Sequence, residues 1–183
     1  MIQPKPYRFS IEEYEQAACA GVWDGVRVEL LDGEVFPMTP IGPGHNFSVA
    51  RFVKQFVLQF GERAMVVSQS PLHLPPDGEP EPDVALLKLP EEQYQSRLPN
   101  GEDVLLLVEV SKSTLEHDRT KKLPIYARAS VPEVWIHNLI DNQLEVYKDP
   151  QGKRYTSLMT YAKGQEVAPL AFSDALTRWW LED

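Results

Sequence analysis

The sequence predicts an α/β (α+β) protein in which helices flank a central mixed β-sheet, with a helix and a β-hairpin at the N-terminus. Two observations support this class. Helical and strand-like periodicities alternate along the chain in the order helix, hairpin, helix, strands, helix, strands. The run Val104–Val108 is continuously apolar, as in a central strand that is covered on both faces. The length of 183 residues suits one domain, which we expect to span residues 1–183.

The N-terminal part predicts a helix, a hairpin and a second helix. Ser10 is a good N-cap residue with Glu13 three positions later, and Gly21 stops the first helix. Asp32-Gly33 is a hairpin turn signal. The expected hairpin strands and the second helix are Val26–Leu31, Glu34–Met38 and Asn46–Phe60.

The remainder predicts the sheet, a third helix and a short final helix. The expected strands are Met65–Ser70, Asp83–Leu87, Val104–Val110, Glu133–Ile140, Gln143–Lys148 and Arg154–Thr160. The third helix, Leu115–Ala129, contains Pro124, which predicts a kink or distortion because proline lacks an amide N–H. The final helix is expected over Asp174–Trp180.

The composition limits the class of protein. The single cysteine, Cys19, excludes an internal disulfide and a cysteine-based zinc site. No apolar run approaches the ~20 residues that cross a bilayer, so we expect a cytoplasmic protein without membrane partners. The net charge of −9 argues against non-specific coating of nucleic acid. Locally, residues 77–92 are acidic and residues 112–128 are basic, a combination that suits a metal site beside a phosphate site.

Two carboxylates stand at the ends of predicted inner strands. Glu109 follows the apolar run Val104–Val108, and Asp83 begins the preceding strand. A carboxylate in a buried strand is costly to desolvate unless a cation compensates it. Two such groups on neighbouring strands form an oxygen site for a hard divalent cation. The alternative, that each carboxylate ends its strand in solvent or caps a turn, is equally compatible with the spacing.

The helix after Glu109 carries three polar side chains on one face. Asp118, Lys122 and Tyr126 are spaced at i, i+4 and i+8. Because this helix leaves directly from the Glu109 strand, Lys122 can project back over the strand end. The alternative is a solvated helical face with one ion pair of small energetic value.

Several motifs accompany these residues. They are Glu81-Pro82-Asp83, Val108–Ser111, the Asp118, Lys122 and Tyr126 spacing, Val131–Ile136, Val28–Glu34 and His45. Together they resemble the Uma2 (DUF820) family, which is common in cyanobacteria and belongs to the PD-(D/E)XK restriction-endonuclease-like superfamily. The resemblance covers about residues 7–179. It implies a restriction-endonuclease-like core, an endonuclease that hydrolyses phosphodiester bonds of DNA with Mg²⁺ (or Mn²⁺), and, as in many members of the superfamily, a homodimer.

The resemblance also implies roles for individual residues. Asp83 and Glu109, with the Val110 carbonyl, would hold Mg²⁺, and Lys122 would position the attacking water and contact the scissile phosphate. Ser111 stands where the superfamily motif has its lysine. In the Uma2 pattern a lysine from the following helix takes that place, and Lys122 matches it.

Four further residues are candidates for the site, and a structural or surface role is the alternative for most of them. Glu29 could be an additional metal ligand or a surface partner of a hairpin cation such as Arg27. His45 could reach the site, although capping the following helix or another structural role is favoured. Tyr126 could hydrogen-bond within the site or pack in the core, and Asp118 could also belong to the site.

Two other functions stay open on the sequence alone. One is a catalytically inactive or regulatory nucleic-acid-binding module on the same fold, which the displaced lysine and the acidic composition favour. The other is a hydrolase of a small anionic substrate, which a pocket too narrow for a duplex would favour.

Overall fold

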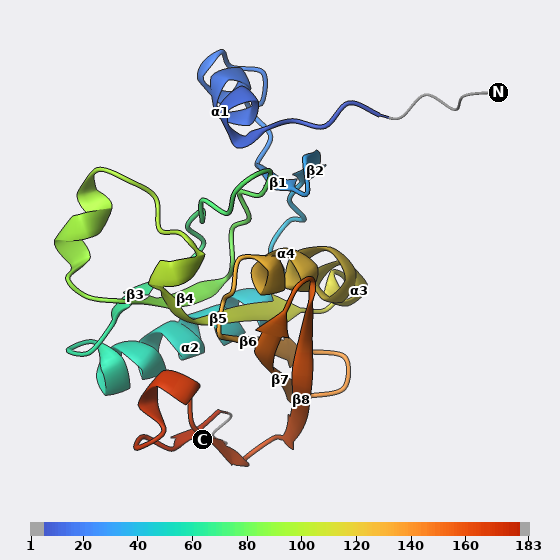
Figure 1. Ribbon diagram of the computed structural model, residues 1–183. Helices are drawn as coiled ribbons and strands as arrows, with labels where there is room; N and C mark the ends of the chain where they lie inside the picture. The colour runs from blue at the N-terminus through green and yellow to red at the C-terminus, as the bar shows by residue number, and fades with distance from the viewer. Residues whose placement is uncertain (1–5, 180–183) are drawn as a thin grey trace.

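The structure is a computed structural model and describes residues 6–179. Its centre is a six-stranded sheet with the order β3-β4-β5-β6-β7-β8 (Figure 1). Within this sheet β5 and β6 pair in parallel and the other neighbours pair antiparallel. The strands are Met65–Val67, Val84–Leu87, Val104–Ser111, Glu133–Asn138, Gln143–Gln151 and Arg154–Ala162. The predicted mixed sheet is confirmed.

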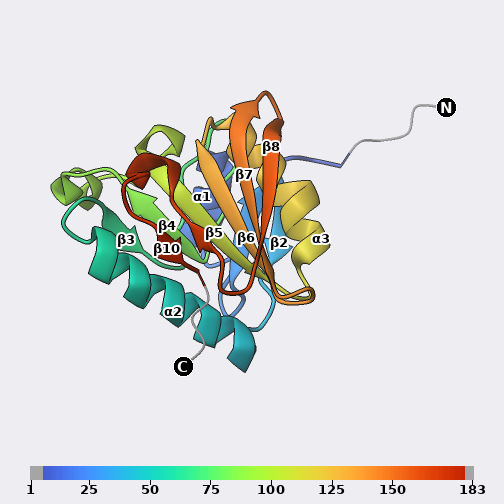
Figure 2. The same ribbon diagram turned by 90° about the horizontal axis from the view of Figure 1, so that it is seen from below.

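Helices cover both faces of the sheet. The helix α2 (Pro43–Phe60) lies against one face, and the helical segment after β5 lies against the other, as Figures 1 and 2 show. On the α2 side, Phe52, Phe56 and Phe60 form a buried apolar stripe, and Phe52 and Phe56 pack against Trp135 of β6. The other side is a separate buried cluster that includes Leu107, Ile136 and Tyr126.

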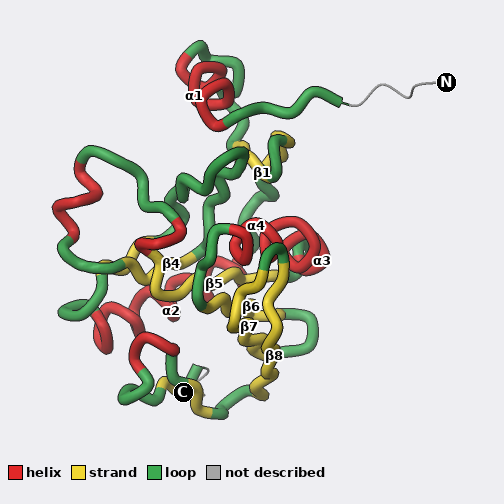
Figure 3. The backbone as a smooth tube through the Cα atoms, viewed as in Figure 1, coloured by secondary structure: helices red, strands yellow, loops and turns green. Residues whose placement is uncertain are grey.

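The N-terminal helix and hairpin lie apart from the large sheet, as the tube in Figure 3 shows. They consist of α1 (Ile11–Cys19), β1 (Val28–Leu31) and β2 (Glu34–Pro37). Ser10 and Glu13 form the predicted capping box at the start of α1. Ile11, Tyr14 and Leu30 make a small buried cluster that attaches α1 to the hairpin.

The helical segment after β5 is distorted as Pro124 predicts. It consists of α3 (Leu115–His117), a π-helical turn (Asp118–Lys122) and α4 (Leu123–Arg128). The Leu123 N–H donates to the Asp118 carbonyl, five residues back, and Pro124, which has no N–H to donate, follows directly. The wide turn occurs where Asp118 and Lys122 enter the site.

Several predicted bounds differ from the structure: β3 ends at Val67 and not at Ser70, and β6 ends at Asn138 and not at Ile140. Two helices also need correction. The helix α2 begins at Pro43 and not at Asn46, because proline suits the first helical position, where its missing N–H is not needed. The predicted helix over Asp174–Trp180 is wrong as far as Trp179, and Trp180 lies outside the described residues. Instead, a 3₁₀ turn is followed by a strand that pairs with an earlier one, and the Trp179 indole N–H donates to the Ala162 carbonyl at 3.0 Å. These elements are Leu170–Phe172, β10 (Thr177–Arg178) and β9 (Glu166–Val167).

Two further 3₁₀ turns, Glu91–Gln95 and Gly101–Asp103, lie between β4 and β5.

Across residues 6–179, none of the helices combines the length and the apolar character that crossing a membrane would require.

Candidate active site

The register of the sheet places Asp83 opposite Glu109. Strands β4 and β5 are antiparallel with Val84 opposite Val108, so the residue before β4 faces the residue after Val108. Side chains alternate along a strand, and Glu109 therefore lies on the same face as Leu107, beneath the helical segment. Both carboxylates are buried. The structure thus brings together the two acidic residues that the sequence placed at neighbouring strand ends.

Hydrogen bonds fix one oxygen of Asp83. Its Oδ2 accepts from the Val110 N–H at 2.8 Å and lies 3.0 Å from His45 Nε2. No hydrogen bond within residues 6–179 involves Oδ1. His45 lies in the first turn of α2, whose N-cap is Gly42, so His45 does not cap this helix. It instead holds Asp83.

Lys122 is a buried cation between two carboxylates. Its Nζ lies 3.0 Å from Glu29 Oε2 and 3.4 Å from Glu109 Oε1, and it donates to the Glu81 carbonyl at 3.3 Å. Burial lowers the pKa of Lys122, but the charges of Glu109, Glu29 and Asp118 outweigh this effect and raise it. Lys122 therefore remains an ammonium at neutral pH.

Glu109 depends on that ammonium. The Tyr126 hydroxyl donates to Glu109 Oε1 at 2.5 Å, the same oxygen that faces Lys122. Burial raises the pKa of Glu109 well above its ordinary range, while the charge of Lys122 opposes this shift. The other oxygen, Oε2, takes part in no hydrogen bond or ion pair within the described part of the chain.

Ser111 and Asp118 attach the helical segment to the end of β5. The Ser111 hydroxyl donates to Asp118 Oδ2 at 2.7 Å, and both residues are buried. Burial raises the pKa of Asp118. Ser111, at the last position of β5, is thus used for a strand-to-helix hydrogen bond.

Glu29 belongs to the site and not to the hairpin surface. It is buried, and its Oε2 accepts from the Glu81 N–H at 3.2 Å as well as facing Lys122. The alternative pairing with Arg27 is wrong, because Arg27 pairs with the Glu81 carboxylate at 2.5 Å. The segment around Glu81 therefore joins the hairpin to the site through its backbone and its side chain.

These groups line a cavity of about 1010 Å³. The loop between β2 and α2, residues 38–42, forms part of its wall, together with His117 and Lys112. Alternation along the strand would turn Lys112 away from the face of Ser111, but Lys112 follows β5 in a bend and lines the cavity too. Neither residue alternation nor spacing could reveal this, because alternation ends where the strand ends.

The basic segment 112–128 is not an open phosphate-binding surface. Three of its cations are held in ion pairs with carboxylates from other elements: Arg119 with Glu145, Lys121 with Glu34, and Arg128 with Asp32 and Asp77. Lys122 is buried with Glu29 and Glu109. Of the five cations in this segment, Lys112 alone has no ion pair among residues 6–179.

Comparisons with known proteins identify the family and the fold of the chain. The Uma2 family model, described as "Putative restriction endonuclease", matches residues 11–180. The fold is similar to a crystal structure of a "putative nuclease belonging to DUF820" from Anabaena variabilis ATCC 29413, with a TM-score of 0.70 and 12% sequence identity over 93% of this chain and 95% of that chain. No curated protein matches the chain.

Proposed function

Because the chain belongs to the Uma2 family, we propose that it is a metal-dependent nuclease that hydrolyses phosphodiester bonds of DNA. One observation carries the proposal: two buried carboxylates face each other across β4 and β5, and a buried ammonium lies beside one of them. Carboxylates of this kind bind hard divalent cations, and an ammonium stabilises the charge that develops on a phosphate.

The donor set fits Mg²⁺ or Mn²⁺. Asp83 and Glu109 each use one oxygen for protein contacts and retain a second oxygen, and both residues line the cavity. The Val110 carbonyl, at the end of the same strand, completes an all-oxygen set. Glu29 Oε2 is occupied by Lys122 and the Glu81 N–H, so Oε1 is the atom that Glu29 could offer to a metal.

A bound cation of this type would acidify a water molecule and offset negative charge on the phosphate in the transition state. The protein's own groups orient the reactants. Glu29 and Glu109 hold the Lys122 ammonium at the cavity wall, where it can contact a phosphate oxygen. Tyr126 fixes the Glu109 carboxylate, and His45 with the Val110 N–H fixes Asp83. Lys112 supplies a further cation at the cavity for the neighbouring phosphate.

A cleavage assay tests the proposal. The protein is incubated with supercoiled, linear duplex and single-stranded DNA, and with RNA, over a titration of Mg²⁺ and Mn²⁺. We expect metal-dependent cleavage of DNA and a loss on the order of 1,000-fold in Asp83→Asn and Glu109→Gln, since the metal supplies several kcal/mol of transition-state stabilisation. Asp174→Asn, which alters an exposed ion pair with Arg63, is the matched control. Absence of cleavage with either metal, or full activity in both site variants, contradicts the proposal.

A second candidate, hydrolysis of a small anionic substrate, is favoured by the cavity. Its volume of about 1010 Å³ is at the upper end of the range of small-molecule pockets. The ion pairs that neutralise the basic segment also leave few cations for a long phosphate backbone. Turnover of a short phosphodiester with no cleavage of DNA would select this candidate.

A further inference from the structure

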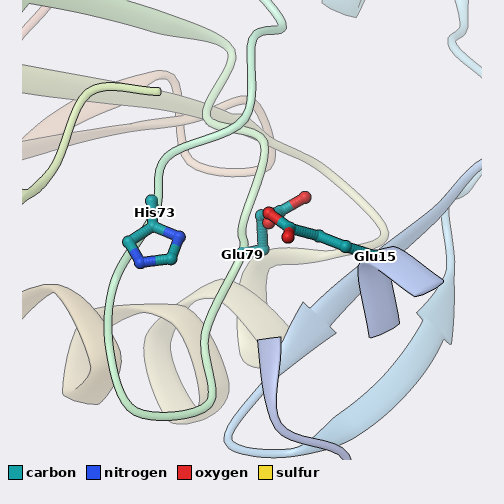
Figure 4. A group of neighbouring side chains, drawn as sticks. All are labelled: Glu15, His73 and Glu79. Carbon is teal, nitrogen blue, oxygen red and sulfur yellow. The ribbon is translucent and has the colours of Figure 1, made fainter. Parts of the chain in front are cut away.

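A second group of ligand-type side chains lies outside the candidate active site. One side-chain donor atom from each of Glu15, His73 and Glu79 lies within 4.8 Å of the other two. Figure 4 shows Glu15 reaching from helix α1 toward Glu79, while His73 and Glu79 extend from the two arms of one loop. Among residues 6–179, this is the one set of three histidine, cysteine or acidic side chains that meets this distance.

Backbone pairing holds two of these side chains together. Leu74 and Gly78 form an antiparallel bridge and exchange hydrogen bonds of 2.8 and 3.1 Å. The next opposed pair is His73 with Glu79, and opposed residues of this kind have Cβ atoms about 4.5–5.5 Å apart. The Glu79 N–H donates to the Leu30 carbonyl at 2.8 Å, which anchors the loop on the hairpin. The two ligands are thus positioned before any cation binds.

One oxygen of the Glu79 carboxyl lacks a partner among the described residues. Its Oε2 is buried and has no hydrogen-bond partner in the described part of the chain. Glu15, the other carboxyl of the group, faces it. Within residues 6–179, no lysine or arginine forms an ion pair with Glu79. A divalent cation at this place would neutralise the two carboxylates and supply the missing partner.

We propose that Glu15, His73 and Glu79 bind a divalent cation of the Zn²⁺ class at a site separate from the candidate active site. One imidazole nitrogen with two carboxylate oxygens suits Zn²⁺, which accepts mixed nitrogen and oxygen ligands. Mg²⁺ prefers oxygen ligands alone. Three protein ligands leave a fourth position for water.

The cation would join α1 to the segment that leads into the active site. Glu15 lies in α1, whereas Glu79 is followed by Glu81 and Asp83, which contact Lys122 and His45 respectively. The helix α1 otherwise attaches to the hairpin through a small apolar cluster. Binding would therefore stabilise the N-terminal unit against the loop between β3 and β4.

Calorimetric titration of the chelator-treated full chain with Zn²⁺ at pH 7 tests this site, with thermal unfolding as a second readout. Asp83→Asn removes a ligand of the candidate active site and should retain Zn²⁺ binding and a Zn²⁺-dependent rise in Tm. Glu79→Gln and His73→Gln should weaken binding on the order of 100-fold or more, because loss of even an outer partner of a metal ligand costs about 10- to 100-fold. Asp174→Asn, which alters only an exposed ion pair with Arg63, is the matched control and should bind as the unaltered chain does.

Two results would overturn the proposal. One is unchanged Zn²⁺ affinity and stoichiometry in both Glu79→Gln and His73→Gln. The other is no Zn²⁺ binding by Asp83→Asn at concentrations up to about 1 mM. The second result is measured on a variant that keeps all three proposed ligands, so it tests the site even where Glu79→Gln and His73→Gln fail to fold.

Discussion

Replacing Lys122 by methionine tests the electrostatics of the candidate active site. The side chain is 7% exposed, and its ammonium lies beside Glu29 and Glu109 at 3.0 and 3.4 Å. Methionine preserves most of the volume and the apolar stem but removes the charge. The two carboxylates then remain buried without their cation.

The expected loss of stability is about 3–5 kcal/mol, the range for removing one partner of a buried ion pair. For a chain of this size 1 kcal/mol shifts Tm by about 2–4 °C, so the variant should melt on the order of 10 °C lower. The loss should also depend on pH. Burial raises the pKa of Glu109 and Lys122 opposes the shift, so without the lysine Glu109 holds its proton to higher pH in the folded state than in the unfolded state. In the variant, the raised pKa of Glu109 stabilises the folded state fully at pH values below 4.5, the ordinary pKa of the unfolded chain. This stabilisation is lost as the pH rises through the higher pKa of the folded state.

Urea unfolding of Lys122→Met and of the unaltered chain at pH 5 and pH 8 measures both effects. We expect a larger difference in unfolding free energy at pH 8. Lys121→Met is the matched control: the neighbouring lysine forms an exposed pair with Glu34 at 3.2 Å, which contributes about 0–1 kcal/mol. A loss below about 1 kcal/mol for Lys122→Met, or an equal loss at both pH values, would refute the reasoning.

Three further predictions concern other buried groups. Burial lowers the pKa of His137 to about 4, so the folded protein should lose up to about 3 kcal/mol of stability as pH falls from about 6.5 to 4, and His137→Asn should flatten this part of the stability profile. Tyr126→Phe removes the hydroxyl that donates to Glu109 and should cost about 1.5–3 kcal/mol in urea unfolding; a smaller effect would mean that Lys122 alone satisfies that oxygen. Phe56→Ala should cost about 3–5 kcal/mol, because Phe56 is fully buried between α2 and the sheet; retention of the original Tm would contradict the described core.

Local patterns in the sequence predict most of the sheet and the acidic pair of the site. The apolar run of β5 ends at Glu109 and the strand β4 begins after Asp83, and both positions follow from strand periodicity alone. The helical spacing of Lys122 and Tyr126 predicts that they share one face, and in the structure both contact Glu109. These inferences succeed because each depends on one element or on two consecutive elements.

The sequence does not predict contacts that depend on how distant elements pack. His45 reaches Asp83 because the start of α2 lies over the strand end, and no local signal gives that placement. The partners of Arg119 and Arg128 lie on β7 and in turns far away in the chain. No neighbouring residue in the sequence therefore indicates that these two charges are held in ion pairs. The sequence predicts a helix for the C-terminal segment, whereas β10 pairs there with β9. Both strands are only two residues long, too short for a strand pattern to be recognised in the sequence.

The hydrogen bond from the Val110 N–H to Asp83 has a consequence for how members of this fold are classified as active or inactive. At this point a side chain, and not the backbone of β4, accepts the N–H of β5, so the carboxylate ends the pairing of the two strands. Alanine here would leave a buried amide without an acceptor, at a cost of about 1–3 kcal/mol, whether or not any chemistry takes place. A chain that had lost its catalytic activity would still need an acceptor at position 83. An aspartate at this position is therefore weak evidence of activity. Asp83→Asn keeps the hydrogen-bond acceptor and so tests the chemical role alone. Asp83→Ala removes the chemical and the architectural role together.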